Sequence, residues 1–207
     1  MIQTAHTAAH TTTTTSVPTR RPFPTLLLAA SGAALFGYIA LRPWSEGDTP
    51  AAWSQILWPV SHLLAVAGFV LYAALGGSVA TRKGRVLGWL SVGLLVPYYG
   101  AEAFGLHVLG SLRVEQAAAI AQAFRYGPLP MITFAGGWIA LGWLAVLVAR
   151  AVRTPDRIGR AALAVHSVAM CAWLPVFFLP PAGRVAHAVI VLIAALVAAA
   201  RLSGKHR

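Results

Sequence analysis

Six long apolar segments divide this chain of 207 residues and constrain its fold more than any other feature. They lie at about 24–41, 52–75, 86–109, 129–149, 161–179 and 185–200, and most charged residues fall between them. Each is close to the ~20 residues that a helix needs to cross a lipid bilayer. Only 10% of the residues are charged, against roughly 25% in soluble domains. The sequence therefore predicts an all-α polytopic membrane protein, a bundle of six transmembrane helices joined by short loops.

The two ends of the chain differ in composition from this bundle. Residues 1–22 are rich in Thr and Ala and have no apolar face, so we expect a disordered cytoplasmic tail. The transmembrane domain is expected over 23–201, and residues 202–207 form a short cytoplasmic C-terminal tail. A full-length apolar span follows Arg20 and Arg21, which favours an uncleaved first helix over a signal peptide.

The positive charges indicate how the bundle is oriented. With the N-terminus inside the cell, 12 of the 16 Lys and Arg residues fall on the cytoplasmic side. These are Arg20, Arg21, Arg82, Lys83, Arg85, Arg150, Arg153, Arg157, Arg160, Arg201, Lys205 and Arg207, and the other four are Arg42, Arg113, Arg125 and Arg184. Because cytoplasmic loops carry an excess of Lys and Arg, both termini are predicted to be cytoplasmic.

The formal net charge of +11 is thus a signal of topology, and it identifies partners only broadly. Anionic lipids of the inner leaflet are the expected electrostatic partners, besides the bilayer itself. Nucleic acid is not expected, since no soluble domain carries a basic stripe interleaved with aromatic residues. A membrane-protein partner or a homo-oligomer is left open. Arg outnumbers Lys 14 to 2 and Ala is abundant, which favours a GC-rich bacterial genome and hence a bacterial plasma membrane.

One carboxylate, Glu102, lies inside the third apolar segment. A titratable group at membrane depth is costly, about 2.5–3.5 kcal/mol on insertion scales, and marks a candidate functional site. At about 1.5 Å of rise per residue, His62 in the second segment has the same predicted depth. Tyr98 and Tyr99 precede Glu102 by one turn. These four residues form the candidate polar or proton-relay site.

Two further histidines, His107 and His187, are predicted to form a shallower layer in the same half of the bundle. Together with Glu102 they could hold a divalent metal ion, or the two could be the axial ligands of one haem. The metal alternative is weakened by spacing, because Glu102 and His107 lie about 140° apart around an ideal helix. The haem alternative is weakened because a transmembrane electron path usually needs a second haem near the other face, where only His166 is available. We therefore expect no cofactor, with a metal ion or haem as the lesser alternative.

Residues 111–128 form the one connection long enough to hold structure of its own. Ala117, Ile120, Ala121 and Phe124 share a face at helical spacing, while Arg125 falls on the polar face. This pattern predicts a short amphipathic helix on the outer surface, acting as a lid or an interfacial anchor.

The functional prediction is a small membrane protein that handles a proton or small solute through Glu102 and His62. The alternative is a scaffold or accessory subunit without catalysis, in which the same polar residues staple helices together. An enzyme is not favoured, because phosphate-binding, zinc-protease, paired-cysteine and serine-hydrolase motifs are all missing from the sequence.

Overall fold

A computed structural model describes residues 22–112, 115–154 and 156–203. Every regular element within these ranges is helical, as the sequence predicts. The predicted N-terminal tail lies almost entirely outside the described residues, and so does most of the C-terminal tail.

Six helical segments are long and apolar enough to cross a membrane. They are α1 (Pro22–Ala40), α3 (Leu57–Val79), the continuous segment Arg82–Ser111, α7 (Pro128–Ala151), α8 (Arg157–Val176) and α9 (Pro181–Ser203). The third segment comprises α4 (Arg82–Gly100), a π-helical turn η2 (Ala101–Gly105) and α5 (Leu106–Ser111). Three short elements complete the fold: η1 (Trp44–Glu46), α2 (Pro50–Ser54) and α6 (Ala117–Tyr126).

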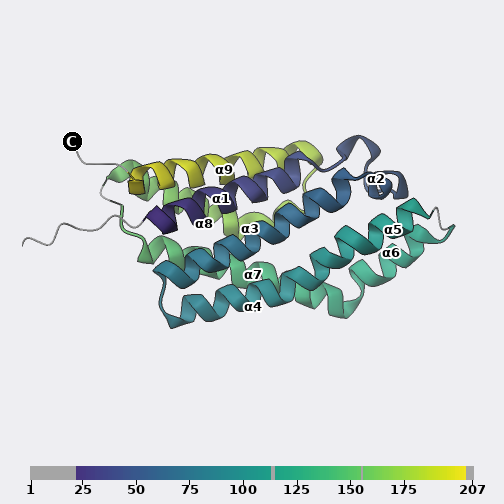
Figure 1. Cartoon of the computed structure of the whole chain (residues 1–207), viewed down its shortest axis with the longest axis horizontal. Coiled ribbons are helices and arrows are strands. Elements are labelled where there is room, and N and C mark those ends of the chain that lie inside the picture. The colour runs from purple at the N-terminus through teal and green to yellow at the C-terminus, as the bar shows by residue number, and fades with distance from the viewer. Residues whose placement is uncertain (1–21, 113–114, 155, 204–207) are drawn as a thin grey trace, which may run out of the picture.

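The six long segments form a closed ring, in which each packs against its neighbours in sequence and α9 returns to pack against α1 (Figure 1). Helix α3 also contacts α7 across the ring. Close approach depends on small residues. A Cβ on Gly32 would lie 2.6 Å from the Cβ of Ala195, and one on Gly68 would lie 2.7 Å from Leu35. These glycines let α1 lie close to α9 and α3, as in other membrane bundles.

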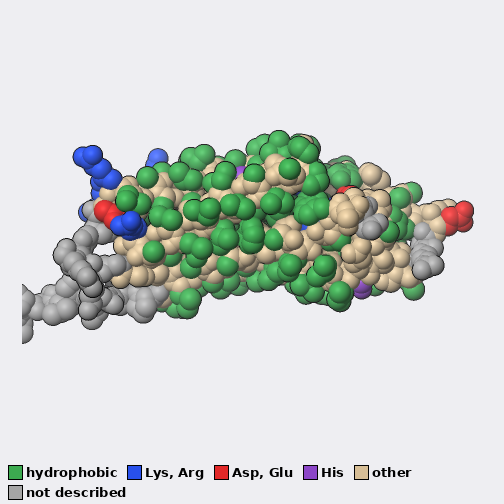
Figure 2. All heavy atoms as spheres, turned by 90° about the horizontal axis from the view of Figure 1, so that it is seen from above, with side chains coloured by type: hydrophobic (Ala, Val, Ile, Leu, Met, Phe, Trp, Pro, Cys, Tyr) green, Lys and Arg blue, Asp and Glu red, His purple; other side chains and the backbone are tan. Residues whose placement is uncertain are grey.

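The centre of the ring is a layer of stacked aromatic side chains. The Trp138 and Trp173 rings are parallel, with centroids 5.1 Å apart, and Phe69 meets Trp138 edge-on at 5.2 Å. All three side chains are buried. Large apolar side chains cover the outside of the bundle along its length (Figure 2), as expected for a surface that faces lipid.

The two ends of the bundle differ in charge. The first residue of α1, the α3–α4 and α7–α8 connections and the last residue of α9 share one end, called here the basic end (Figure 1). Lys and Arg side chains gather there in Figure 2. The opposite end carries η1, α2, α6 and the α8–α9 turn and is called the site end.

The second long helix begins later than the sequence pattern predicts. We expected a span from residue 52, interrupted by Pro59, but α2 ends at Ser54 and α3 starts at Leu57. Pro59 therefore lies in the first turn of α3, where its missing N–H is not needed by the helix. The polar break at Gln55, whose backbone is extended, turns α2 away from the bundle axis.

Candidate functional site

Glu102 lies in the π-helical turn η2, with only 3% of its surface exposed. A π turn places an extra residue in the helix and often occurs at functional sites. Pro97 precedes it by one turn and lacks the N–H that would bond to the carbonyl four residues earlier. The Trp58 indole N–H donates to the Glu102 backbone oxygen at 2.8 Å and fixes this turn against α3.

His62, from α3, faces the Glu102 carboxylate with its Nε2 atom 3.6 Å from Oε2. Its Nδ1 atom is 2.7 Å from the Trp58 carbonyl oxygen and 3.3 Å from Ser61 Oγ. Because a carbonyl oxygen only accepts hydrogen bonds, Nδ1 must carry the hydrogen. In the neutral ring Nε2 is then an unprotonated acceptor directed at Glu102. The 3.6 Å separation is longer than a hydrogen bond, so proton exchange between the two requires a closer approach or one bridging water.

The other carboxylate oxygen of Glu102 is held by Arg125, whose Nε donates to Oε1 at 2.6 Å. Arg125 comes from α6, which folds back over the site end and packs against α5 and α7. We predicted that Arg125 would face away from the bundle, and this was wrong: Arg125 is 8% exposed, whereas Ile120 is exposed. The buried face of α6 consists of Ala117, Ala121 and Arg125, because the apolar stem of Arg125 reaches in to the carboxylate.

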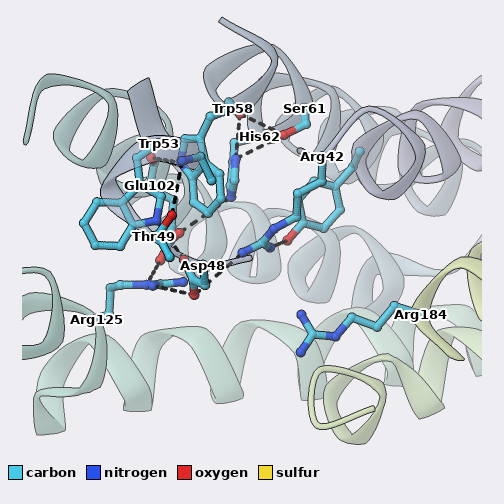
Figure 3. Close-up of polar contacts among 12 residues, drawn as sticks. Arg42, Asp48, Thr49, Trp53, Trp58, Ser61, His62, Glu102, Arg125 and Arg184 are labelled. Atoms are coloured by element: carbon cyan, nitrogen blue, oxygen red, sulfur yellow. Dashed lines mark hydrogen bonds and ion pairs between the residues drawn. The ribbon is translucent and has the colours of Figure 1, made fainter. Parts of the chain in front are cut away.

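Asp48, in the connection between η1 and α2, completes a charged cluster around Arg125 (Figure 3). Its Oδ2 accepts from Arg125 Nη1 at 2.8 Å and lies 3.9 Å from Arg42 Nη2. Its Oδ1 accepts from the Trp53 indole N–H at 2.8 Å. Arg125 therefore bridges two carboxylates that are 54 positions apart in the sequence, Asp48 and Glu102.

The ion pair between Asp48 and Arg125 shifts the pKa values of both groups. Partial burial alone would raise the pKa of Asp48, but Arg125, the Trp53 hydrogen bond and Arg42 together hold it below its usual value. Burial alone would lower the pKa of Arg125, but the Glu102 and Asp48 carboxylates raise it above the usual range. Arg125 is thus a permanent cation and Asp48 a carboxylate in the native cluster.

A pair of arginines, Arg42 and Arg184, lies beside this cluster. Arg42 follows the end of α1, and Arg184 lies in the first turn of α9. Both guanidinium carbons lie over the Trp44 ring, at 5.1 Å and 5.4 Å from its centroid. Arg42 also lies 4.5 Å from the Trp58 ring and donates to Tyr38 Oη at 3.3 Å.

These groups share a cavity of about 240 Å³ at the site end. Its lining includes both charged side chains and aromatic or apolar ones. The lining residues are Tyr38, Arg42, Asp48, His62, Tyr98, Tyr99, Glu102, Arg125, Tyr126, Met131, Phe134, Phe177, Phe178 and Arg184. The cavity reaches the surface where Asp48 and Phe178 are exposed.

The four residues proposed from the sequence as the polar site, Glu102, His62, Tyr98 and Tyr99, all line this cavity. Tyr99 is buried, and its ring meets Tyr38 at 5.5 Å, while Tyr98 packs on Phe134 at 4.6 Å. Their role as a polar or proton-relay site stays a prediction.

His107 and His187 are not brought together. His107 Nδ1 is 2.8 Å from the Trp53 carbonyl oxygen in α2, and His187 Nε2 is 2.9 Å from the Ala169 carbonyl oxygen in α8. Helices α5 and α9 lie on different sides of the bundle (Figure 1). Within the described part of the chain, no three His, Cys, Asp or Glu side chains converge as a metal site would require. The geometry gives the metal and haem alternatives no support.

Sequence reasoning did not propose four of the charged residues at the cavity: Arg42, Asp48, Arg125 and Arg184. The three arginines were noted as lying outside the predicted cytoplasmic side, and Arg125 also as part of the polar face of the predicted amphipathic helix. That exception was itself a signal, since charges that oppose the topology of a membrane protein need another reason to be there.

The fold and the cavity define a class: a multi-pass helical membrane protein with a buried ionic cluster beneath a polar cavity at one end. Comparisons with family models, curated proteins and solved structures find no match to this chain.

Proposed function

We propose that this protein binds or carries a small solute in the site-end cavity, linked to protonation of the Glu102–His62 pair. The observation that carries the proposal is the position of one buried carboxylate between an acceptor nitrogen of His62, at 3.6 Å, and the Arg125 cation, at 2.6 Å. A proton on Glu102 would weaken its bond to Arg125, because a neutral carboxyl no longer attracts the guanidinium.

The arrangement supports a coupled site better than an open proton channel. His62 and Tyr99 both line the cavity, and the Tyr99 ring packs in turn against Phe69 and Trp138, which also pack against each other. This aromatic layer offers no obvious path for protons across the bundle. A proton entering from the site end would therefore stop at the pair unless helices move.

A change in the protonation of Glu102 would act on helix α6 through Arg125. Arg125 joins α6 to Glu102 on the third long segment and to Asp48 on the loop before α2. Releasing one of these bonds would loosen α6 over the cavity. We propose that α6 is the lid of the site. We also propose that the site end faces away from the cytoplasm. The basic end would then contact the inner leaflet of a plasma membrane.

The test is proton movement by the purified protein in liposomes, followed with an internal pH dye after an imposed pH step and with a solute mixture outside. Glu102→Gln preserves shape and removes titration, so it should abolish solute-dependent proton movement while the protein stays folded. His107→Gln is the matched control, because His107 bonds a backbone carbonyl outside the cavity. Equal proton movement in wild type and Glu102→Gln would refute the proposal.

A structural role is the second candidate, and one observation favours it. Arg125, Glu102 and Asp48 tie together three segments that are far apart in sequence. In that case the protein is a scaffold or accessory subunit, and Glu102→Gln changes stability without changing any transport or sensing signal. The same pair of variants, measured for unfolding as well as for proton movement, separates the two functions.

A further inference from the structure

Two like charges converge on one wall of the cavity. The guanidinium carbons of Arg42 and Arg184 both lie within 5.4 Å of the Trp44 ring centroid. Arg42 reaches the Asp48 carboxylate only at 3.9 Å. Among the residues that the structure describes, Arg184 makes no ion pair with a carboxylate. Repulsion between neighbouring cations is relieved when an anion binds between them.

The protein itself holds both guanidinium groups in place. Arg42 is buried and donates to Tyr38 Oη, while Arg184 donates from Nε to the Leu179 carbonyl oxygen at 2.8 Å. The Trp44 ring that both groups contact is fixed by its own N–H, which donates to the Ile39 carbonyl oxygen at 2.8 Å. In Figure 3 the Arg184 guanidinium is directed from α9 towards the charged cluster. Guanidinium groups oriented in this way favour carboxylate or phosphate oxygens.

The charge of the cavity is also unbalanced. Among the lining residues that the structure describes, three arginines stand against two carboxylates, those of Asp48 and Glu102. Arg125 bonds to both carboxylates at 2.8 Å or less, so the surplus positive charge lies at Arg42 and Arg184. One monoanion would neutralise it.

The apolar part of the lining indicates what the rest of the ligand is. Met131, Phe134, Phe177 and Phe178 line the cavity with apolar surface. Its volume of about 240 Å³ exceeds the roughly 150 Å³ in which an engineered apolar cavity holds benzene. A body about the size of one aromatic ring or a short alkyl chain therefore fits beside the arginines.

We infer that the solute is a small amphipathic anion, with a carboxylate or phosphate head between Arg42 and Arg184 and an apolar body against Phe134 and Phe177. This inference rests on the proposed function, because it names the chemical class of the solute. The same chemistry could come from a soluble organic anion or from the end of an anionic membrane lipid.

The experiment measures binding of radiolabelled benzoate and phenyl phosphate to the full chain in phosphatidylcholine nanodiscs. Neutral benzamide serves as the competitor without charge. Arg184→Gln should weaken binding about ten- to a hundredfold, as expected for loss of a charge-assisted hydrogen bond. Arg201→Gln, which removes a half-exposed arginine at the basic end, should leave binding unchanged. Arg184→Lys keeps the charge but not the planar guanidinium group. Its affinity for the probes should lie between those of Arg184→Gln and Arg201→Gln.

Failure of both probes to bind saturably, or equal binding by wild type and Arg184→Gln, would overturn the inference. Competition by benzamide as strong as by benzoate would do the same. Unfolding temperatures of the variants show whether a loss of binding reflects a loss of fold, and Arg42→Gln provides a second, independent removal of charge from the same wall.

Replacing part of the phosphatidylcholine with phosphatidylglycerol distinguishes the two sources of the anion. Competition by this lipid that disappears in Arg184→Gln identifies a lipid headgroup, whereas unchanged probe binding identifies a soluble anion, and either result supports the anion site.

Probe binding that persists without any Glu102-dependent proton movement would refute the proposed function alone. Glu102-dependent proton movement without probe binding would refute the anion site alone.

Discussion

Arg125 Nε lies 2.6 Å from Glu102 Oε1, and both residues are more than nine-tenths buried. This contact joins a surface helix to the interior of a membrane-spanning segment. It also supplies the counter-charge that a carboxylate needs at this depth, since an unpaired buried charge is strongly destabilising.

We predict that Arg125→Gln lowers the free energy of unfolding by about 3–5 kcal/mol, because it removes the guanidinium that holds the buried Glu102 carboxylate and the Asp48 carboxylate. The double variant Glu102→Gln with Arg125→Gln should be more stable than Arg125→Gln alone. Denaturant unfolding in detergent measures both. The control is Arg201→Gln, whose half-exposed bond to Asp156 contributes about 0–1 kcal/mol. Strictly additive effects of the two cluster substitutions would contradict the pairing.

The lowered pKa of Asp48 predicts a pH dependence of stability. A carboxylate whose folded pKa is depressed stabilises the fold above its unfolded pKa, about 3.9, and loses this contribution as the pH falls through the folded value. Wild type should therefore exceed Asp48→Asn in unfolding temperature near neutral pH, and the difference should shrink below about pH 4. A difference that grows on acidification would show that Asp48 is not held as a carboxylate.

Gly110 should be sensitive to substitution because α2 lies directly on it. A Cβ at this position would lie 2.6 Å from the Pro50 carbonyl oxygen and 2.7 Å from the Ser54 nitrogen, and backbone atoms cannot move aside cheaply. Gly110→Ala should cost about 1–3 kcal/mol and should change the fluorescence of Trp53. Gly93→Ala is the matched control: nothing lies within 4 Å of its Cβ, so its effect should be neutral or stabilising.

The basic end predicts the orientation of the bundle. A reporter enzyme that is active only outside the cytoplasm should work when fused after Leu112 and fail when fused after Arg85 or Arg153. Each fusion needs a check of its expression level. Activity after Arg85 together with inactivity after Leu112 would invert the topology and place the cavity on the cytoplasmic side.

The fold was predictable from sequence because six apolar segments of membrane-spanning length admit few alternatives. Depth counting also proposed Glu102 and His62 as neighbours, since it needs only the helix rise and antiparallel helices. It did not predict the π turn at residues 101–105, which changes which faces the later residues present. His107 points to the Trp53 carbonyl oxygen as a result of tertiary packing that no helical projection contains.

The arginines were harder to predict because their side chains are long. Arg125 was placed on the polar face of its helix by periodicity, which treats every charge as facing water. Its guanidinium instead reaches Glu102, and that contact depends on α6 folding back over the bundle. Arg184 and Asp48 lie in a turn of helix and a loop whose positions follow only from the assembled ring.

The most direct test of the central claim is the protonation state of Glu102 itself, followed by infrared difference spectroscopy during pH titration of the protein in lipid. We predict a band of a protonated carboxyl that appears on acidification in wild type, changes in position or pH dependence in His62→Gln, and is missing in Glu102→Gln. If wild type and Glu102→Gln give the same difference spectra throughout the titration, Glu102 keeps one protonation state. The buried cluster would then be a structural ion pair and not a proton-linked site.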